Sequence, residues 1–253
     1  MNAPFGQPGT LLDPANPINK GLVGWWPMWE GAGEGAMDIS GGFSHGLLTN
    51  GAKFARGGID FDGADDFINI ANPSTGLKTL KNGPFSISIR VMLDLNVVYG
   101  GLIFLNAIGI TQSNGAIYGV VSPFGSVAVT APITLGKIQH IVGMYDGTAY
   151  RIFLDGVESF GTTSDGGYGQ DNQYRIMKGY ADGVSDGVVY EAAAWNRALT
   201  PTEINKLFRN RYSGLRAQDI SRLYAPAAAA AGGGLRIIGD AGAMRIVAPG
   251  GLG

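Results

Sequence analysis

Short apolar runs separated by glycine-containing turns make up most of the chain. Phe85, Ile87, Ile89 and Val91 alternate with polar residues, which is the period-two pattern of a strand with one buried face. The apolar stretch 188–195 predicts a further core strand. The chain is therefore expected to fold mainly as β-strands.

Two Asp-Gly pairs divide the segment 141–160 into three β-rich runs. The pairs are Asp146-Gly147 and Asp155-Gly156, and each is a strong signal for a tight turn between antiparallel strands. The segment therefore predicts a meander of three consecutive strands.

The periodicity changes after residue 199, where a helix is predicted. Thr200 supplies an N-cap, Pro201 suits the first helical position, and Glu203 is placed to complete a capping box. The apolar residues that follow fall on one helical face. They are Ile204, Leu207 and Phe208.

The two ends of the chain differ in composition from its middle. Residues 1–20 contain four prolines, which lack an amide donor and favour extended backbone, so an extended N-terminal arm is expected there. Residues 21–212 are expected to form the main β domain. Residues 213–253 include an Ala/Gly tract and are expected to form a linker and a C-terminal β-hairpin arm.

The C-terminal arm holds two short apolar segments. Two strands form at most a hairpin, and an isolated hairpin is only marginally stable in water. We therefore expect this arm to contact a partner surface by strand addition or arm exchange. The residues expected to make this contact are Leu235, Ile237, Met244 and Ile246.

Composition excludes several classes of protein. The chain of 253 residues has 42 glycines and only 15% charged residues, which favours many short strands. Its net charge of −2, without a run of Lys or Arg, argues against a nucleic-acid partner. The lack of cysteine excludes disulfides and thiolate metal sites. The first twenty residues have no apolar run that would predict a signal peptide or a membrane span.

Five segments resemble, in order, the motifs of the laminin-G-like jelly-roll family of the concanavalin A-like lectin/glucanase superfamily. They are the stretch beginning GLVGWWPMWEGAGEG, then IDFDGADDFINI, FSISIRVML, HIVGMYDGTAYRIFLDGVE and YEAAAWNRALTPTEINKLF. Together they cover roughly residues 20–210. The resemblance implies a two-sheet antiparallel jelly-roll sandwich. With the helix and arms predicted above, the expected fold is all-β, a two-sheet antiparallel jelly-roll sandwich with one short C-terminal helix and extended terminal arms.

Members of this family occur in secreted adhesins, in carbohydrate-binding modules and, without a leader sequence, in virion proteins of tailed phages. Because no leader is evident, we expect a non-enzymatic structural protein of a phage virion, assembled in the host cytoplasm. It would be a capsid decoration or fibre protein, docked through its arms onto capsid or other virion proteins, and a homo-oligomer with three-fold symmetry. The alternative is a carbohydrate-binding host-attachment module, an adhesin or lectin that binds a surface glycan.

In glucanases of the superfamily, carboxylates alternate on one strand to act as acid and nucleophile. This chain has no such run, so no catalytic residue is expected. Asp60, Asp62 and Asp65 are interpreted as turn residues whose carboxylates accept local amides. The alternative is a calcium site formed by the same three residues, with Asp182 and Asp186 as a second candidate. No other cofactor is expected, and both histidines are interpreted as structural.

Aromatic residues are the candidates for a glycan site, because exposed rings stack on sugars. Adjacent residues of a strand face opposite sides, so one of Trp25 and Trp26 is expected in the core and the other outside or under the N-terminal arm. The plainer interpretation is that all the tryptophans pack. The candidate glycan-binding residues are Trp26, Tyr168, Tyr174 and Tyr180.

Overall fold

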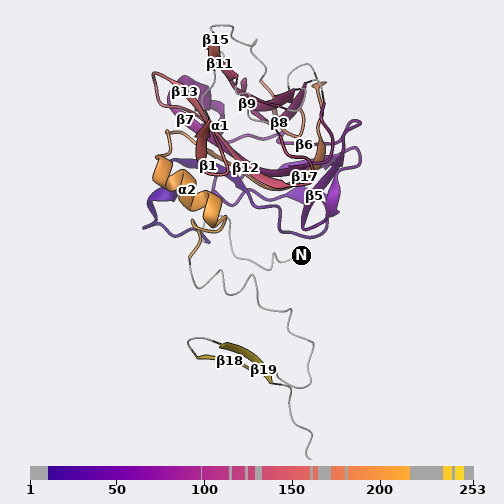
Figure 1. Ribbon diagram of the computed structural model, residues 1–253, viewed down its shortest axis with the longest axis vertical. Helices are drawn as coiled ribbons and strands as arrows, with labels where there is room; N and C mark the ends of the chain where they lie inside the picture. Colours follow the sequence, from indigo (N-terminus) through magenta and orange to yellow (C-terminus); the bar gives the residue numbers. More distant parts are fainter. Residues whose placement is uncertain are drawn as a thin grey trace, which may run out of the picture. The chain divides into compact units, whose positions relative to one another are not determined.

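The computed structural model describes residues 11–97, 99–113, 116–122, 125–128, 133–159, 162–164, 172–179, 182–216, 236–240 and 243–247. The chain divides into two separately compact units, Met1–Arg216 and Ala217–Gly253. Two large antiparallel sheets belong to the first unit, and a two-stranded sheet belongs to the second (Figure 1).

The first sheet has eight strands. They are β1 (Leu22–Trp26), β4 (Lys53–Ala55), β5 (Gly58–Asp62), β7 (Phe85–Leu93), β12 (Ile138–Tyr145), β13 (Tyr150–Leu154), β14 (Val157–Ser159) and β17 (Asp186–Trp195). Their order is β14-β13-β12-β7-β17-β5-β4, and β1 also pairs with β17. The strand β17 is long enough to pair with β5 along residues 186–189 and with β1 along residues 192–195.

The second sheet has nine strands. They are β2 (Gly35–Ala36), β3 (Gly46–Thr49), β6 (Phe67–Asn69), β8 (Gly100–Leu105), β9 (Ile108–Ser113), β10 (Ala116–Ser122), β11 (Gly125–Ala128), β15 (Thr162–Ser164) and β16 (Tyr174–Ile176). Their order is β15-β11-β10-β9-β8-β16-β6-β3-β2. The expected all-β fold of two antiparallel sheets is thus confirmed.

Helical segments are short. They are η1 (Pro17–Asn19), α1 (Thr75–Lys78), η2 (Leu80–Asn82) and α2 (Pro201–Arg209). In the described part of the chain, no helix has the length and apolar character needed to span a membrane.

The core lies between the sheets, and the alternation in β7 shows why. Its four apolar residues, from Phe85 to Val91, are at most 2% exposed and belong to the main apolar cluster. The intervening Ser86 and Ser88 are also buried. They are covered because α2 lies over the outer face of this sheet, where the ring of Phe208 stacks on His140 with centroids 6.3 Å apart. Both faces of β7 therefore contribute to stability.

Local signals in the sequence predict the turns and the helix correctly. The strands β12, β13 and β14 form the expected meander. The turn between the last two has Asp155 and Gly156 at positive φ (52° and 81°), which an Asp-Gly pair adopts at low cost. The capping box between Thr200 and Glu203 is present at the start of α2.

The expected extended arm over residues 1–20 is contradicted for residues 11–20, which fold onto the first unit. Leu12 forms an antiparallel bridge with Leu215, and the indole of Trp195 donates a 2.7 Å hydrogen bond to the Ile18 carbonyl. Ile18 is 2% exposed. Prolines in this segment restrict the backbone without preventing its apolar side chains from packing, so the segment is ordered by its own chain.

The predicted C-terminal hairpin is present in the second unit. Strands β18 (Arg236–Asp240) and β19 (Ala243–Val247) pair with Ile237 opposite Ile246 and with Met244 opposite Gly239. Leu235 lies outside the described residues. The boundary between the units follows Arg216, four residues beyond the expected end of the β domain. The expected contacts of this hairpin with a partner stay a prediction.

Candidate functional site

A polar pocket of about 670 Å³ lies beside α1 and β16 in the first unit. Its walls come from the end of β6 and the loop after it, from α1 and η2, from the turn between β8 and β9, and from the start of β16. The lining residues are Asn69, Ile70, Ala71, Asn72, Pro73, Lys78, Lys81, Asn106, Asn172, Gln173 and Tyr174. Its volume is typical of pockets that hold small molecules.

Backbone hydrogen bonds hold these walls together. The Ile70 amide donates to the Tyr174 carbonyl at 2.9 Å, and the Asn106 amide donates to the Gln173 carbonyl at 2.9 Å. Asn106 has a φ of 53° in the tight turn between β8 and β9. Asparagine tolerates this left-handed backbone better than most residues, which accounts for its place in the turn.

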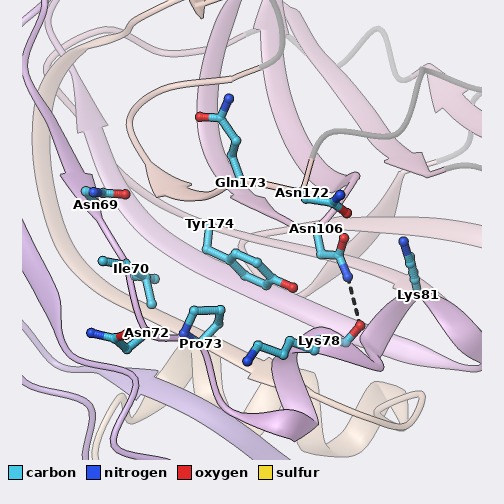
Figure 2. A pocket seen from close by; sticks show the side chains of 11 residues that line it. Asn69, Ile70, Asn72, Pro73, Lys78, Lys81, Asn106, Asn172, Gln173 and Tyr174 are labelled. Atoms are coloured by element: carbon cyan, nitrogen blue, oxygen red, sulfur yellow. Dashed lines mark hydrogen bonds between the residues drawn. The ribbon is translucent and has the colours of Figure 1, made fainter.

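The pocket is rich in side-chain amides. Four asparagines and one glutamine line it, and each amide offers both donors and an acceptor. Asn106 donates to the Lys78 carbonyl at 2.8 Å, while its own side-chain oxygen is buried and has no partner among the described residues. In Figure 2 this oxygen points away from Lys78, towards Asn172. This oxygen is an acceptor that the described residues leave unsatisfied.

Tyr174 is the only predicted glycan residue that the described structure places in this pocket. Figure 2 shows its ring between Asn106 and the Ile70–Pro73 side of the lining. The side chain is 7% exposed, and burial raises the pKa of its hydroxyl. Because the ring is buried, it forms part of the wall and does not present an open stacking face. Tyr168 and Tyr180 lie outside the described residues.

Trp26 is contradicted as a glycan-binding residue, because it is fully buried. Its indole donates a 2.8 Å hydrogen bond to the Ser44 carbonyl from within the core. Trp25 is also buried and donates to the Glu191 carboxylate at 2.8 Å. Strand β1 is covered on both faces, so neither indole is available to a ligand. Of the two places expected for the second indole, the outside is wrong. Trp25 instead lies beside the N-terminal segment, where it lines a small cavity with Ile18 and Asn19.

The predicted calcium residues do not form one cluster. Asp62 and Asp65 lie together, and Asp66 joins them with ligand oxygens all within 4.8 Å of one another. Asp60 instead pairs with the Arg56 guanidinium, which also bonds Asp94 at 2.6 Å and whose pKa these two carboxylates raise. Asp60 is therefore neutralised by Arg56 and does not belong to the cluster.

The second calcium candidate is separated in the structure. Asp182 forms ion pairs with Arg175 (3.0 Å) and Lys178 (3.3 Å). Asp186 pairs in register with Asp62 at the start of β17. Burial raises the pKa of Asp186, as do the nearby negative charges that include Asp62. Negative charge is therefore concentrated where the end of β5 pairs with the start of β17.

A buried serine–histidine contact lies under α2. Ser88 Oγ and His140 Nε2 are 2.8 Å apart, and these residues are 4% and 1% exposed. Burial, followed by the Arg90 charge, lowers the pKa of His140 to about 3. The ring is neutral at physiological pH and is inaccessible to a substrate, as expected of a structural histidine.

The fold agrees with the comparison to protein families. Residues 62–205 match the family model described as the concanavalin A-like lectin/glucanases superfamily. The match covers more than half of the chain, and the chain belongs to this superfamily. No curated protein matches the sequence closely enough to count as a relative.

Three solved structures illustrate the likeness in fold. A sialidase from Trypanosoma rangeli has a TM-score of 0.59 and 18% identity, over 81% of this chain and 37% of the sialidase chain. The binding domain of Paraclostridial Mosquitocidal Protein 1 has a TM-score of 0.56 and 14% identity, over 77% and 53%. Domain 4 of AbnA, an extracellular arabinanase from Geobacillus stearothermophilus in complex with arabinotriose, has a TM-score of 0.54 and 18% identity, over 74% and 97%.

These neighbours correct the expectation of a non-enzymatic protein. The sandwich aligns with about a third of the length of sialidase chains, so this fold occurs within glycosidases. One fold hosts several chemistries, and the lack of a single glucanase motif does not exclude the class. What the fold supports is a glycosidase-like domain or a binding domain.

The expected place in a phage virion receives no support from these comparisons. The family model and the neighbours concern lectins, glucanases, a binding domain and sugar-bound proteins. Capsid partners, three-fold assembly and a virion location stay predictions. The carbohydrate-binding alternative fits the comparisons better.

Proposed function

We propose that this chain is a carbohydrate-binding domain that takes a saccharide in the pocket beside α1 and β16. The observation that carries the proposal is the amide-rich lining of four asparagines and one glutamine. Sugar hydroxyls both donate and accept hydrogen bonds, and side-chain amides match them in both roles. Membership of a superfamily of lectins and glucanases supports this ligand class.

The exposed part of the lining supplies side chains that can contact a ligand without rearrangement. Asn72, Asn172 and Gln173 are exposed, while Tyr174 and Asn106 form the buried floor and wall. Domain 4 of AbnA, which has a similar fold, is in complex with arabinotriose, a neutral oligosaccharide.

The test is an array of neutral and acidic oligosaccharides, followed by titration calorimetry with each saccharide that binds. The double variant Asn172→Ala/Gln173→Ala removes two exposed amides from the lining. Each lost hydrogen bond contributes about 0.5–1.5 kcal/mol. For two bonds we therefore expect the dissociation constant to rise by roughly 5- to 160-fold.

Asn205→Ala is the matched control, because Asn205 lies on α2 and outside the pocket lining. It should bind as the wild type does. Absence of any saccharide signal above background, or equal affinity of the double variant and the control, contradicts the proposal.

A further inference from the structure

The lining of the saccharide pocket carries positive charge. Lys78 at the end of α1 and Lys81 in η2 belong to it, and none of the described residues that line the pocket is acidic. The chain as a whole has a net charge of −2. The charge of this lining is therefore local, and its sign is opposite to that of the net charge of the chain.

Lys78 is held at the pocket by its backbone, while its side chain is exposed. Its amide donates to the Ser74 carbonyl at 3.0 Å, and its carbonyl accepts from the Asn106 side chain at 2.8 Å. Figure 2 shows the lysine side chain running from this contact towards the Pro73 side of the lining. It forms no ion pair with any of the described residues, so its ammonium is available to a ligand.

Positive charge continues on the strands next to the pocket. Asn69 lines the pocket and pairs in register with Arg175 of β16, so the two side chains lie on the same face of the sheet. Arg175 and Lys178 both lie over the Phe67 ring, 5.7 Å and 4.7 Å from its centroid. Both cations pair with the carboxylate of Asp182, which is 71% exposed. One carboxylate does not neutralise two cations, so this face stays positive.

Cations beside side-chain amides suit a sugar that carries a negative charge. An ammonium binds a carboxylate or a sulfate through charge-assisted hydrogen bonds, which are stronger than neutral ones. The amides of the lining can bond the hydroxyl groups of the same ligand. The surrounding positive charge also raises the local concentration of an anionic ligand.

We propose that the pocket binds an acidic saccharide, with a carboxylate or sulfate group placed against Lys78. This inference rests on the proposed function of the pocket and adds the charge of its ligand. Lys81 and the face formed by Arg175 and Lys178 contribute to the positive field around that group.

The experiment titrates the full-length chain with pairs of an acidic saccharide and a neutral counterpart. The pairs are trigalacturonate with its methyl ester, sialyllactose with lactose, and sulfated lactose with lactose. In at least one pair the acidic member should bind about fivefold more tightly, as one exposed ion pair allows. Its dissociation constant should rise when NaCl is raised from about 20 to 200 mM, because salt screens exposed charges. The pairs also distinguish a carboxylate from a sulfate.

Three variants separate the role of Lys78 from a general effect of charge. Lys78→Gln removes the ammonium and should weaken binding of the acidic member roughly 3- to 10-fold, with no change for the neutral one. Lys78→Arg keeps the charge and should stay within about twofold of the wild type. The matched control is Lys206→Gln, which makes the same change in net charge on α2, outside the pocket lining. It should bind as the wild type does, and circular dichroism checks that each variant is folded.

Two results overturn the inference and leave the saccharide proposal in place. One is equal binding of the acidic and neutral members in every pair, with both weakened in the Asn172→Ala/Gln173→Ala variant. The other is an equal loss of affinity in Lys78→Gln and Lys206→Gln, which would indicate a general effect of net charge. Absence of binding in all pairs contradicts the saccharide proposal itself, and this inference with it.

Discussion

His140 is a residue whose charge state is fixed by its surroundings. It lies between Ser88 and Phe208 under α2, and burial next to Arg90 keeps its ring neutral, with a pKa of about 3. In the unfolded chain an ordinary histidine has a pKa of about 6.5. Between these two values the unfolded chain binds more protons than the folded one, so stability must fall as the pH is lowered through this range.

His140→Gln should therefore reduce the acid sensitivity of folding. The free energy of unfolding, measured by urea titration at several values between about pH 3 and 6.5, should fall less steeply in the variant than in the wild type. The difference in slope should approach about 1.4 kcal/mol per pH unit. Equal slopes in the two proteins would show that His140 does not govern this dependence.

Glu191 contributes to the same profile with the opposite sign. Burial raises its pKa, although Arg90 and Trp25 stabilise its charge. The folded state holds this proton more tightly than the unfolded chain, so stability from Glu191 is greatest at low pH and is lost as the pH rises through its raised pKa. Comparison of variant and wild type at each pH removes this contribution from the His140 measurement.

At the scale of single residues, the sequence predicted which residue types form a feature better than it predicted where their side chains lie. It identified the acidic turn, but not that Asp66 is buried in it or that Arg56 neutralises Asp60. Both facts depend on contacts between segments that a local pattern does not contain. Trp26 was misplaced for the same reason, because strand alternation gives two faces but not what covers each of them.

The helix α2 is held at both ends by polar contacts. At its start, the Glu203 amide donates to the Thr200 hydroxyl, and the Glu203 carboxylate accepts from the Thr200 amide at 2.8 Å. At its end, the Arg90 guanidinium donates to the carbonyls of Leu207 and Phe208. These bonds satisfy backbone groups that a helix leaves unpaired at its ends.

Thr200→Ala should destabilise the first unit by about 0.5–2 kcal/mol, which is the usual effect of losing an N-cap. Thr202→Ala changes an exposed residue on the same helix and should remain within about 0.5 kcal/mol of the wild type. Urea denaturation followed by circular dichroism compares the two. An equal loss in both variants would contradict the capping role.

Elements whose signals are local were predicted well. The meander β12–β13–β14 follows from two Asp-Gly turns, and the start of α2 follows from Thr200, Pro201 and Glu203. The pocket was not predicted as a whole. It combines residues from four separate parts of the chain, and only Tyr174 among its lining was selected from the sequence.

For the whole molecule, the division into two units leads to a test of the expected assembly through the C-terminal arm. Deletion of residues 227–253 should leave a soluble, folded sandwich. If the hairpin joins copies of the chain or other proteins, the truncated protein should lose that association in sedimentation velocity. A truncated chain that associates as the full-length chain does would exclude the arm as the contact.

The N-terminal segment shows the limit of composition as a guide to the complete fold. Four prolines indicated an extended arm, yet in residues 11–20 Ile18 is buried, its carbonyl accepts from Trp195, and Leu12 bridges to Leu215 at the end of the first unit. Proline content constrains φ but does not determine whether a segment packs on its own domain.

The bridge between Leu12 and Leu215 sets the two ends of the sandwich side by side. Domains whose termini are adjacent accept insertion into a host loop and circular permutation. If residues 11–216 are inserted into an exposed loop of an unrelated carrier protein, the sandwich should fold without distorting the carrier, because its two ends are close together. Because the two ends are close, a short linker can also join them, and new termini can be made in another loop by circular permutation. The domain is therefore suited to insertion into other proteins.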